Sequence, residues 1–278
     1  MRLAAARNLG KAWLSLLIAC ALPGGLGWAL DGARGASIFV FCVLLAALGV
    51  YAYADRALLG MLGARPYLPA EGPALAAAVE RLSRRLEIAP PKLYFIADGF
   101  PRALTVGRGP RGAALAVSQG LLAALPPEEL EGVLAHELVH IRNRDVLIQT
   151  AAVIVAATLI ELSRIGGWLE RALLFVLAPI AAAVVSLLLS PKRELAADRA
   201  AADLLGTPHG LADALVRLEL AGELIEFAAS PATEPLYTLN PFAEEGLALM
   251  FVTHPPVASR IERLRGLDPG WRAKLHAA

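Results

Sequence analysis

The stretch PPEELEGVLAHELVHIRNR, residues 126–144, decides how the chain around it folds. Its two prolines suit a first helical turn, and its glutamates at 128, 129 and 131 suit the positive end of a helix dipole. Apolar side chains then recur at helical spacing, at Leu130, Val133, Leu134, Leu138 and Ile141. The pattern predicts a single amphipathic helix.

This predicted helix carries His136 and His140, with Glu137 between them. Side chains four residues apart project from one face of a helix, so both imidazoles should reach a single metal ion. Glu137 is placed to activate a water molecule, so the pattern favours amide hydrolysis with Glu137 as the general base. The alternative is a pair of surface or core histidines on an amphipathic helix, which five residues alone do not exclude.

A catalytic zinc ion takes three protein ligands and keeps a fourth position for water, so a third ligand is needed. His209, in a predicted loop, and His276, in the tail, are typical of solvated surface residues. Glu194 begins a predicted helix directly after an apolar run, and Asp198 lies on the same face. We expect Glu194 to be the third ligand and Asp198 to accept a hydrogen bond from a ligand imidazole. The alternative is a solvated helix start whose acidic residues suit the dipole.

The composition indicates a membrane protein. Hydrophobic residues make up 57% of the 278 residues and charged residues 18%, with a mean hydropathy of +0.57. These values are too apolar for an ordinary soluble domain of this length. The net charge of +1 and the pI near 7.9 give no basic field, so no nucleic-acid partner is expected. Cys20 and Cys42 lie in apolar runs away from the histidines, so neither is a predicted ligand.

Four apolar stretches predict about four transmembrane helices. Residues 13–30 and 36–54 form the first pair, which we expect to be a retained hairpin because no clear signal-peptide cleavage site precedes a soluble sequence. Residues 146–162 and 172–189 form the second pair. They are also predicted to insert, although stretches of this length can form a buried helical hairpin instead. Glu161 would then lie near the far interface.

The basic residues predict the orientation in the membrane. One side of the four-span arrangement carries Arg2, Arg7, Lys11, Arg56, Arg65, Arg142, Arg144, Lys192 and Arg193, and the other carries Arg34, Arg164 and Arg171. The richer side should be cytoplasmic, and both halves of the predicted metal site lie on it. The expected segments are a transmembrane hairpin (1–56), the first part of a cytoplasmic domain (57–145), a second apolar hairpin (146–190) and the second part of that domain (191–278).

Short strands are predicted between the two apolar pairs, over residues 92–97, 103–106 and 113–118, with a helix before them over 71–86. The expected fold class is therefore mainly α with a small antiparallel β-sheet (α+β). An edge strand along the metal helix would receive an extended substrate through backbone hydrogen bonds. The residues predicted for this contact are Ala114, Leu115, Ala116 and Val117. Further helices are predicted over 194–205, 211–227 and 257–267, and a loop over 230–242.

Four motifs occur in the order found in the HtpX-type membrane metallopeptidases, which the chain resembles over nearly its whole length. They are GVLAHEL (132–138), HIRNRD (140–145), RELAAD (193–198) and THPP (253–256). The resemblance implies a gluzincin-like zinc metallopeptidase domain with one Zn²⁺ per chain. It also implies a multi-pass protein of the bacterial inner membrane whose active site faces the cytoplasm. Its implied substrates are damaged or misassembled membrane proteins in the lipid bilayer.

The resemblance also implies a role for each matching residue. His136, His140 and Glu194 match the zinc ligands, Glu137 matches the general base, and Asp198 matches the supporting acid. The resemblance places His254 near the cleft, where it either stabilises the oxyanion or fixes a Pro-Pro turn.

Two positions depart from the family pattern, and two other functions remain open. Arg102 stands where the family commonly has an asparagine, a departure that concerns the substrate geometry and not metal binding, and Val139 stands where a small residue is usual. A CAAX-type prenyl-protein peptidase shares the zinc chemistry, but such enzymes look longer and have more spans. A non-catalytic membrane adaptor would bind unfolded segments along its edge strand. A missing metal ligand or a missing general base would distinguish such an adaptor from the enzyme.

Overall fold

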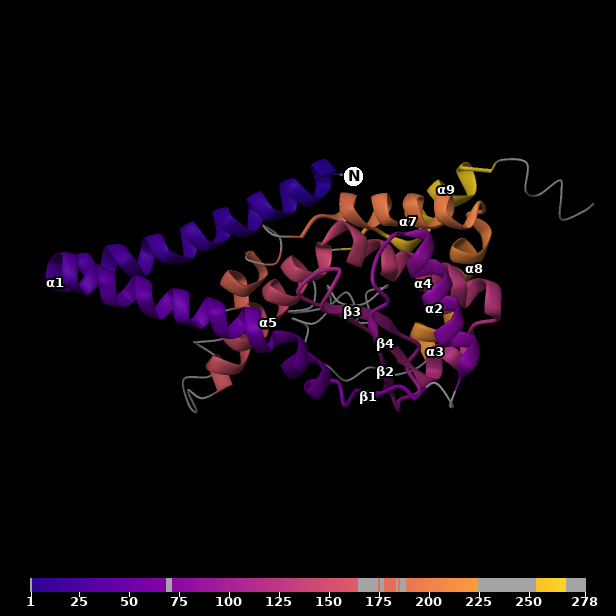
Figure 1. Cartoon of the computed structure of the whole chain (residues 1–278), viewed down its shortest axis with the longest axis horizontal. Helices are drawn as coiled ribbons and strands as arrows, with labels where there is room; N and C mark the ends of the chain where they lie inside the picture. Colours follow the sequence, from indigo (N-terminus) through magenta and orange to yellow (C-terminus); the bar gives the residue numbers. More distant parts are fainter. Residues whose placement is uncertain are drawn as a thin grey trace, which may run out of the picture.

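A mixed four-stranded sheet lies between two sets of helices in the computed structural model of this chain (Figure 1). The structure describes residues 2–68, 72–164, 175, 178–183, 185, 189–224 and 254–268. Its elements are α1 (Arg2–Met61), β1 (Arg65–Pro66), α2 (Pro73–Arg85), β2 (Lys92–Ile96), β3 (Ala103–Gly107), β4 (Ala113–Ser118), α3 (Gln119–Ala124), α4 (Pro127–Asn143), α5 (Asp145–Arg164), α7 (Pro191–Leu205), α8 (His209–Leu224) and α9 (Val257–Gly266). The predicted loop over 230–242, His276 and half of the stretch 172–189 lie outside the described residues.

The sheet has the strand order β1-β2-β4-β3, and the prediction that it is antiparallel is wrong for one pair. β3 and β4 are antiparallel, as are β1 and β2, but β2 and β4 run parallel, with Tyr94 opposite Ala116. A tight hairpin turn makes neighbouring strands antiparallel, and the β3–β4 connection is of this kind. The β2–β3 connection is longer and turns at Asp98, so β4 fills the place between the two strands.

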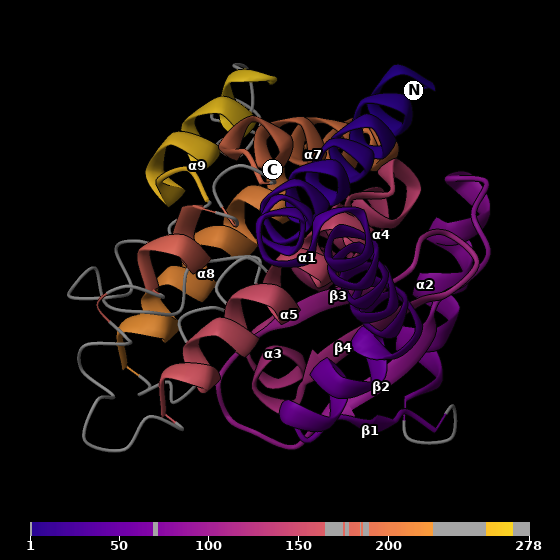
Figure 2. The same cartoon turned by 90° about the vertical axis from the view of Figure 1, so that its left-hand side faces the viewer.

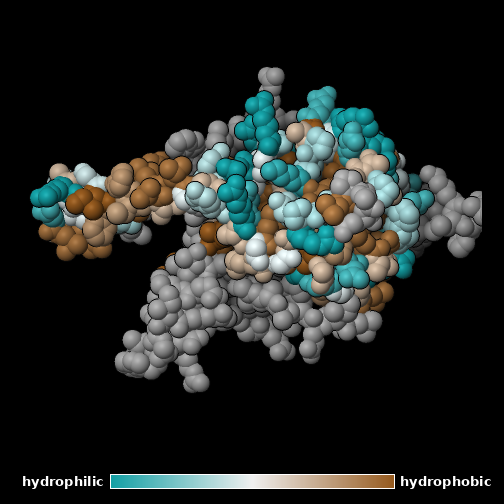
Figure 3. All heavy atoms as spheres, turned by 60° about the horizontal axis from the view of Figure 1, so that its bottom comes forward, coloured by the Kyte–Doolittle hydropathy of each residue, from teal (hydrophilic) through white to brown (hydrophobic). Residues whose placement is uncertain are grey.

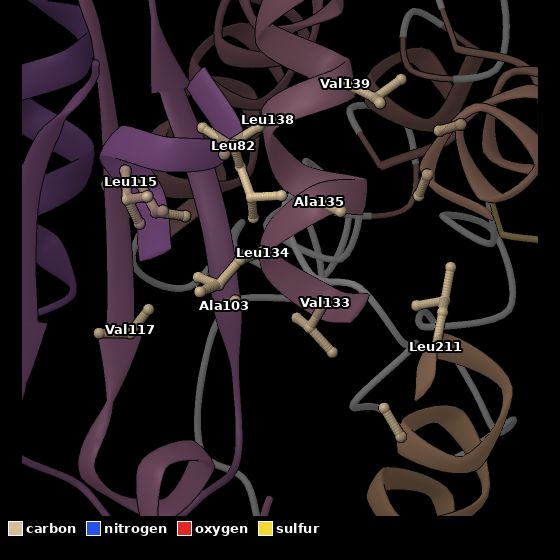
Figure 4. Packing of buried hydrophobic residues seen from close by; sticks show 14 of the residues in the cluster. Leu82, Ala103, Leu115, Val117, Val133, Leu134, Ala135, Leu138, Val139 and Leu211 are labelled. Carbon is tan, nitrogen blue, oxygen red and sulfur yellow. The ribbon is translucent and has the colours of Figure 1, made fainter. Parts of the chain in front are cut away.

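Side chains alternate between the two faces of the sheet, and each face has its own core. Ala103, Leu115 and Val117 pack on the face toward α4. Figure 4 shows Leu134 and Leu138 pointing from α4 toward these strands, while Val139 points away from them. The opposite face packs against the end of α1 and against α5, through Leu58, Leu59, Leu104, Val106, Ala114, Ala116 and Val153. The sheet therefore fixes α4 relative to the helices on its other side.

Helix α4 lies between the sheet and helices α7 and α8. It is buried along most of its length, and it approaches α8 closely at Gly132. A Cβ atom on Gly132 would lie 2.6 Å from the backbone nitrogen of Leu211, so only glycine fits there without a shift of backbone. This contact sets the distance between the two helices one turn before His136.

Helix α1 is a hairpin of two limbs that projects from the rest of the fold (Figures 1 and 2). The chain reverses at Asp31 (φ −148°, ψ 34°) and Gly32 (φ 55°, ψ −141°), a left-handed φ that favours glycine. Near the turn the limbs touch, because a Cβ atom on Gly27 would lie 2.4 Å from the carbonyl oxygen of Gly35. The predicted pair of apolar helices over 13–30 and 36–54 corresponds to these limbs.

The projecting hairpin is covered with apolar side chains (Figure 3). Leu26, Trp28, Phe41, Leu44, Leu45 and Leu48 are all exposed on it. Within the described part of the chain, Pro23–Gly49 is the one helical stretch that is long and apolar enough to cross a membrane, and it includes the turn. The structure thus has an apolar N-terminal hairpin but does not show four transmembrane helices. Of the second predicted pair, the first stretch lies in helix α5, whose segment Asp145–Ile154 is apolar.

Candidate metal centre

The three predicted metal ligands meet between α4 and α7. His136 and His140 lie one turn apart on α4, and Glu194 lies in the first turn of α7, which Pro191 begins. The Nε2 atoms of the two histidines are 3.1 Å apart, and Glu194 Oε2 lies 3.4 Å from the first and 3.5 Å from the second. All three side chains are almost completely buried. The long apolar segment between His140 and Glu194 in the sequence therefore does not separate these side chains in space.

These three atoms suit a tetrahedral metal ion. A tetrahedral site whose bonds are about 2.0–2.1 Å long has ligand atoms about 3.3 Å apart, which is close to the three measured separations. Two imidazoles and one carboxylate are also the donor set of a known class of catalytic zinc site. Among the described residues, this is the group of histidine, cysteine and acidic side chains whose donor atoms converge closely enough to hold a metal ion.

Each ligand imidazole contacts a carboxylate through its other nitrogen. His136 Nδ1 lies 2.9 Å from Asp198 Oδ1, and His140 Nδ1 lies 3.0 Å from Asp145 Oδ2. A carboxylate at Nδ1 favours the tautomer whose proton is on Nδ1, so the lone pair of Nε2 points to the metal position. Asp198 thus lies in contact with a ligand imidazole, as the sequence analysis predicted. Asp145 was not predicted as a partner of His140.

A sharp turn between α4 and α5 brings Asp145 back to His140. Helix α4 ends at Asn143, Arg144 is left-handed with φ 62°, and α5 begins at once with Asp145. A left-handed residue after the last helical turn ends a helix and redirects the chain. The motif around 140–145 contained this acid, but its spacing from His140 alone does not reveal the turn.

Arg260 is the second residue of the site that the sequence did not reveal. Its guanidinium donates two hydrogen bonds to Asp198, from Nε to Oδ2 at 2.8 Å and from an Nη atom to Oδ1 at 2.7 Å. The side chain is completely buried. Burial opposes the charged form of Asp198, but Arg260 holds the pKa of this carboxyl well below its usual range. The α9 helix thereby keeps the partner of His136 ionised.

Carboxylates dominate the electrostatics of the ligands. Burial disfavours a charged imidazolium, but Glu194 and Asp145 together raise the pKa of His140 to about 10. Burial likewise disfavours an ionised Glu194, yet His140 and His254 hold its pKa well below the usual range. Arg193 also donates to Glu194 Oε1 at 3.0 Å. The site therefore attracts positive charge, as a cation-binding site must.

The remaining predicted catalytic residues lie beside this group. Glu137 is buried on α4 and accepts a hydrogen bond from Thr105 Oγ1 on β3, at 3.0 Å from Oε2. His254 is buried, and its Nε2 lies 3.6 Å from Glu194 Oε2. The structure thus places His254 beside the metal group. His209, by contrast, pairs with Asp268 at 3.1 Å.

The prediction that Ala114, Leu115, Ala116 and Val117 form a substrate-binding edge is wrong. These residues belong to β4, which pairs with β2 on one side and with β3 on the other. Their backbone groups therefore already take part in ladder hydrogen bonds. The strand at this edge of the sheet is β3, which also carries the contact to Glu137.

Arg102, at the start of β3, is bound within the protein. Its guanidinium pairs with Asp98, and its backbone nitrogen donates to Ser118 Oγ at 2.9 Å. The side chain is 7% exposed. Arg102 therefore stabilises the turn between β2 and β3 in this structure.

Comparisons with known proteins agree with this arrangement. Residues 69–268 match Peptidase family M48. A protein named "Protease HtpX homolog" from Pelotomaculum thermopropionicum is 37% identical over 275 residues, covering 92% of this chain and 98% of that protein. Another of that name, from Pyrococcus abyssi, is 40% identical over 266 residues, covering 88% and 91%.

A solved structure has the same fold. The crystal structure of S. mikatae Ste24p aligns with a TM-score of 0.50 at 19% identity. The alignment covers 95% of this chain and 63% of that chain, so this chain spans less than two thirds of its length.

Proposed function

The chain belongs to peptidase family M48, and we propose on that premise that it is a zinc-dependent endopeptidase acting on misfolded or damaged membrane proteins. It is a membrane metalloprotease, since its close relatives are HtpX proteases over nearly their whole length. The observation that carries the proposal is the convergence of His136, His140 and Glu194 on one point, with Glu137 beside them.

Different residues of this chain have different roles in the proposed hydrolysis. Zinc, when bound, supplies a Lewis acid that polarises the scissile carbonyl and makes water acidic near neutral pH. Glu137 takes a proton from the attacking water and delivers it to the leaving amine. His254, whose Nε2 lies 3.6 Å from the Glu194 oxygen that also faces the two ligand imidazoles, donates to the tetrahedral oxyanion. Asp145 and Asp198 keep the imidazoles in the binding orientation.

We propose that the substrate lies along β3 in extended form. An extended peptide binds a sheet by adding a strand to an exposed edge, and main-chain hydrogen bonds hold it. Within the described residues, β3 pairs with β4 on one side and with no strand on the other. Its residues are buried, so a peptide would meet the backbone edge of the strand, and at the end of that edge the Gly107 nitrogen already donates to Thr150 Oγ1. The hydrogen bond from Thr105 to Glu137 supports this proposal, because it joins the strand to the proposed base.

The membrane placement supports a substrate that is itself in the membrane. The α1 hairpin offers an apolar surface, and α5 begins at Asp145, which contacts a metal ligand. We propose that the metal lies just above the cytoplasmic face of the bilayer, where the basic residues of the chain concentrate. Its substrates are then cytoplasmic loops and ends of membrane proteins.

Cleavage by the purified full-length chain tests the function. We expect an unfolded casein-like substrate to be cut in the presence of zinc and not after chelation. Glu137→Gln should retain zinc and lose about 10²-fold or more in turnover, because it cannot take a proton. Glu128→Gln, an exposed glutamate on the same helix, should cleave like wild type. Near-wild-type cleavage by Glu137→Gln, with contaminating proteases excluded, would remove the general-base assignment, and tight binding of substrate without cleavage would indicate the adaptor.

A further inference from the structure

Thr105 is the one polar side chain of strand β3, and it faces the catalytic helix. The strand reads Ala-Leu-Thr-Val-Gly and is buried at every position. Ala103 and, by the alternation of a strand, Thr105 lie on the face toward α4, whereas Leu104 and Val106 pack on the other face. A hydroxyl buried among apolar side chains is costly unless it has a hydrogen-bond partner. Here the partner is Oε2 of Glu137, at 3.0 Å.

The contact joins two parts of the site that come from different layers of the fold. Glu137 lies on α4, and Thr105 lies on the strand proposed to receive the substrate. A hydrogen bond to an ionised carboxylate is stronger than one between neutral groups. A β-branched side chain has few accessible χ1 rotamers, so the position of its hydroxyl follows that of the strand. The orientation of the Glu137 carboxylate is therefore fixed relative to β3.

We propose that Thr105 is a positioning residue, which holds the Glu137 carboxylate in the orientation needed for proton transfer to and from a substrate bound along β3. This inference rests on the proposed function of Glu137 as the base. Proton transfer requires the donor and acceptor to be within hydrogen-bond reach in a defined geometry, and small displacements are costly. One strand then sets the position of both the scissile bond and the base that acts on it.

Replacement of Thr105 by valine tests the inference, because valine has the same shape without the hydroxyl. We expect kcat to fall by about 10-fold or more, with KM and zinc content unchanged. Thr105→Ser keeps the hydroxyl and should return kcat to within about twofold of wild type. Thr150→Val is the matched control: Thr150 lies on α5, is also buried beside β3, and accepts from the Gly107 nitrogen at 3.1 Å at the end of β3. It should retain the wild-type kcat, whereas a merely structural effect of losing a buried hydroxyl near β3 would lower kcat in both variants.

A double-mutant cycle separates positioning from packing. In Glu137→Asp the carboxylate is one methylene shorter and withdraws from Thr105, so Thr105→Val should cause little further loss in that background. The inference is overturned if Thr105→Val has a wild-type kcat, if its loss is the same in both backgrounds, or if Thr105→Ser is as impaired as the valine variant. Failure of the proposed function has a different signature, since Glu137→Gln would then remain active whatever residue stands at position 105.

Discussion

The raised pKa of His140 determines how the site takes up its metal. Glu194 and Asp145 raise this pKa to about 10 despite burial, so the metal-free imidazole is protonated at neutral pH. Only the neutral imidazole binds a metal, so binding must release this proton. The apparent metal affinity should therefore rise as the pH rises toward 10 and fall as the pH falls.

Isothermal titration of the metal-free chain with zinc measures this linkage. At pH 7.5 the observed enthalpy should change with the ionisation enthalpy of the buffer, with a slope of about one proton or more released per zinc bound. Equal enthalpies in buffers of different ionisation enthalpy would show that His140 is already neutral.

The Arg260–Asp198 pair is predicted to hold the fold together as well as the ligand. Removing one partner of a buried ion pair leaves the other charge uncompensated, which costs about 3–5 kcal/mol. Arg260→Met should lower the free energy of unfolding of the metal-free chain by about this amount in denaturant unfolding. Adding Asp198→Asn should recover part of the loss, because the uncompensated charge is then gone.

An exposed arginine on the same helix is the control for this prediction. Arg263→Met should change the stability by at most about 0.5 kcal/mol. If the Arg260 variant is as stable as the Arg263 variant, the pair has no structural role.

Individual residues of the site differed in how far the sequence revealed them. His136, Glu137 and His140 lie within one helical turn, so spacing alone predicts that they share a face. Glu194 and Asp198 were predictable because a helix start and a four-residue spacing are local features. Asp145, Arg260 and Thr105 reach the site through a backbone turn, a distant helix and a strand register, and no local pattern contains that information.

The close crossing of α4 and α8 is the element-scale feature most sensitive to mutation. A methyl group at Gly132 would meet the backbone of Leu211 and Gly210, which cannot move out of the way as a flexible side chain can. Gly132→Ala should therefore lower the free energy of unfolding by about 1–3 kcal/mol, through overpacking. Denaturant unfolding of the wild type and of Gly132→Ala measures this difference in free energy.

Gly266→Ala is the matched control for this substitution. Gly266 lies at the end of α9, and a Cβ atom there would meet nothing within 4 Å. Alanine has the higher helix propensity, so this variant should be as stable as wild type or slightly more stable. Equal effects of the two substitutions would show that the helix crossing tolerates a side chain.

The elements themselves were mostly predictable, whereas their arrangement was less so. Helical periodicity located α2, α4, α7, α8 and α9 to within a few residues, and turn residues located the three longer strands. The strand order was not predictable from the sequence. No residue pattern in segment 97–102 indicates whether β3 pairs directly with β2 or lies one strand further away, with β4 between them. The error about Ala114–Val117 follows from this one point, since an inserted β4 cannot be an edge.

At the scale of the whole molecule, the prediction concerns the α1 hairpin. Cys42 is exposed on its second limb, and Cys20 lies on the first. If the hairpin inserts in a bilayer, a membrane-impermeant maleimide should label neither thiol in intact membranes and both after denaturation in detergent. A cysteine introduced by Glu128→Cys into a chain with Cys20→Ala and Cys42→Ala should be labelled in open membranes, because residue 128 is exposed on the body of the fold. Labelling of Cys42 at the rate of that control would show that the hairpin lies in water.

The overall composition predicted an apolar N-terminal hairpin that the structure contains, because long apolar runs separated by glycine and charged residues are a strong signal. The fate of the second apolar pair was less predictable. A helix such as α5 can be apolar because it contacts lipid or because it packs on the sheet, and the packing of Val153 against β3 and β4 shows that part of it does the latter.

The pairing of Arg260 with Asp198 also has a consequence for biosynthesis. Arg260 follows Asp198 by 62 residues, so a nascent chain contains His136, His140 and Glu194 well before it contains the guanidinium that neutralises Asp198. Until α9 is synthesised, the Asp198 carboxylate beside His136 lacks its two hydrogen bonds from Arg260. The complete set of side chains around the metal group is therefore present only late in translation, after the apolar α1 hairpin has been synthesised.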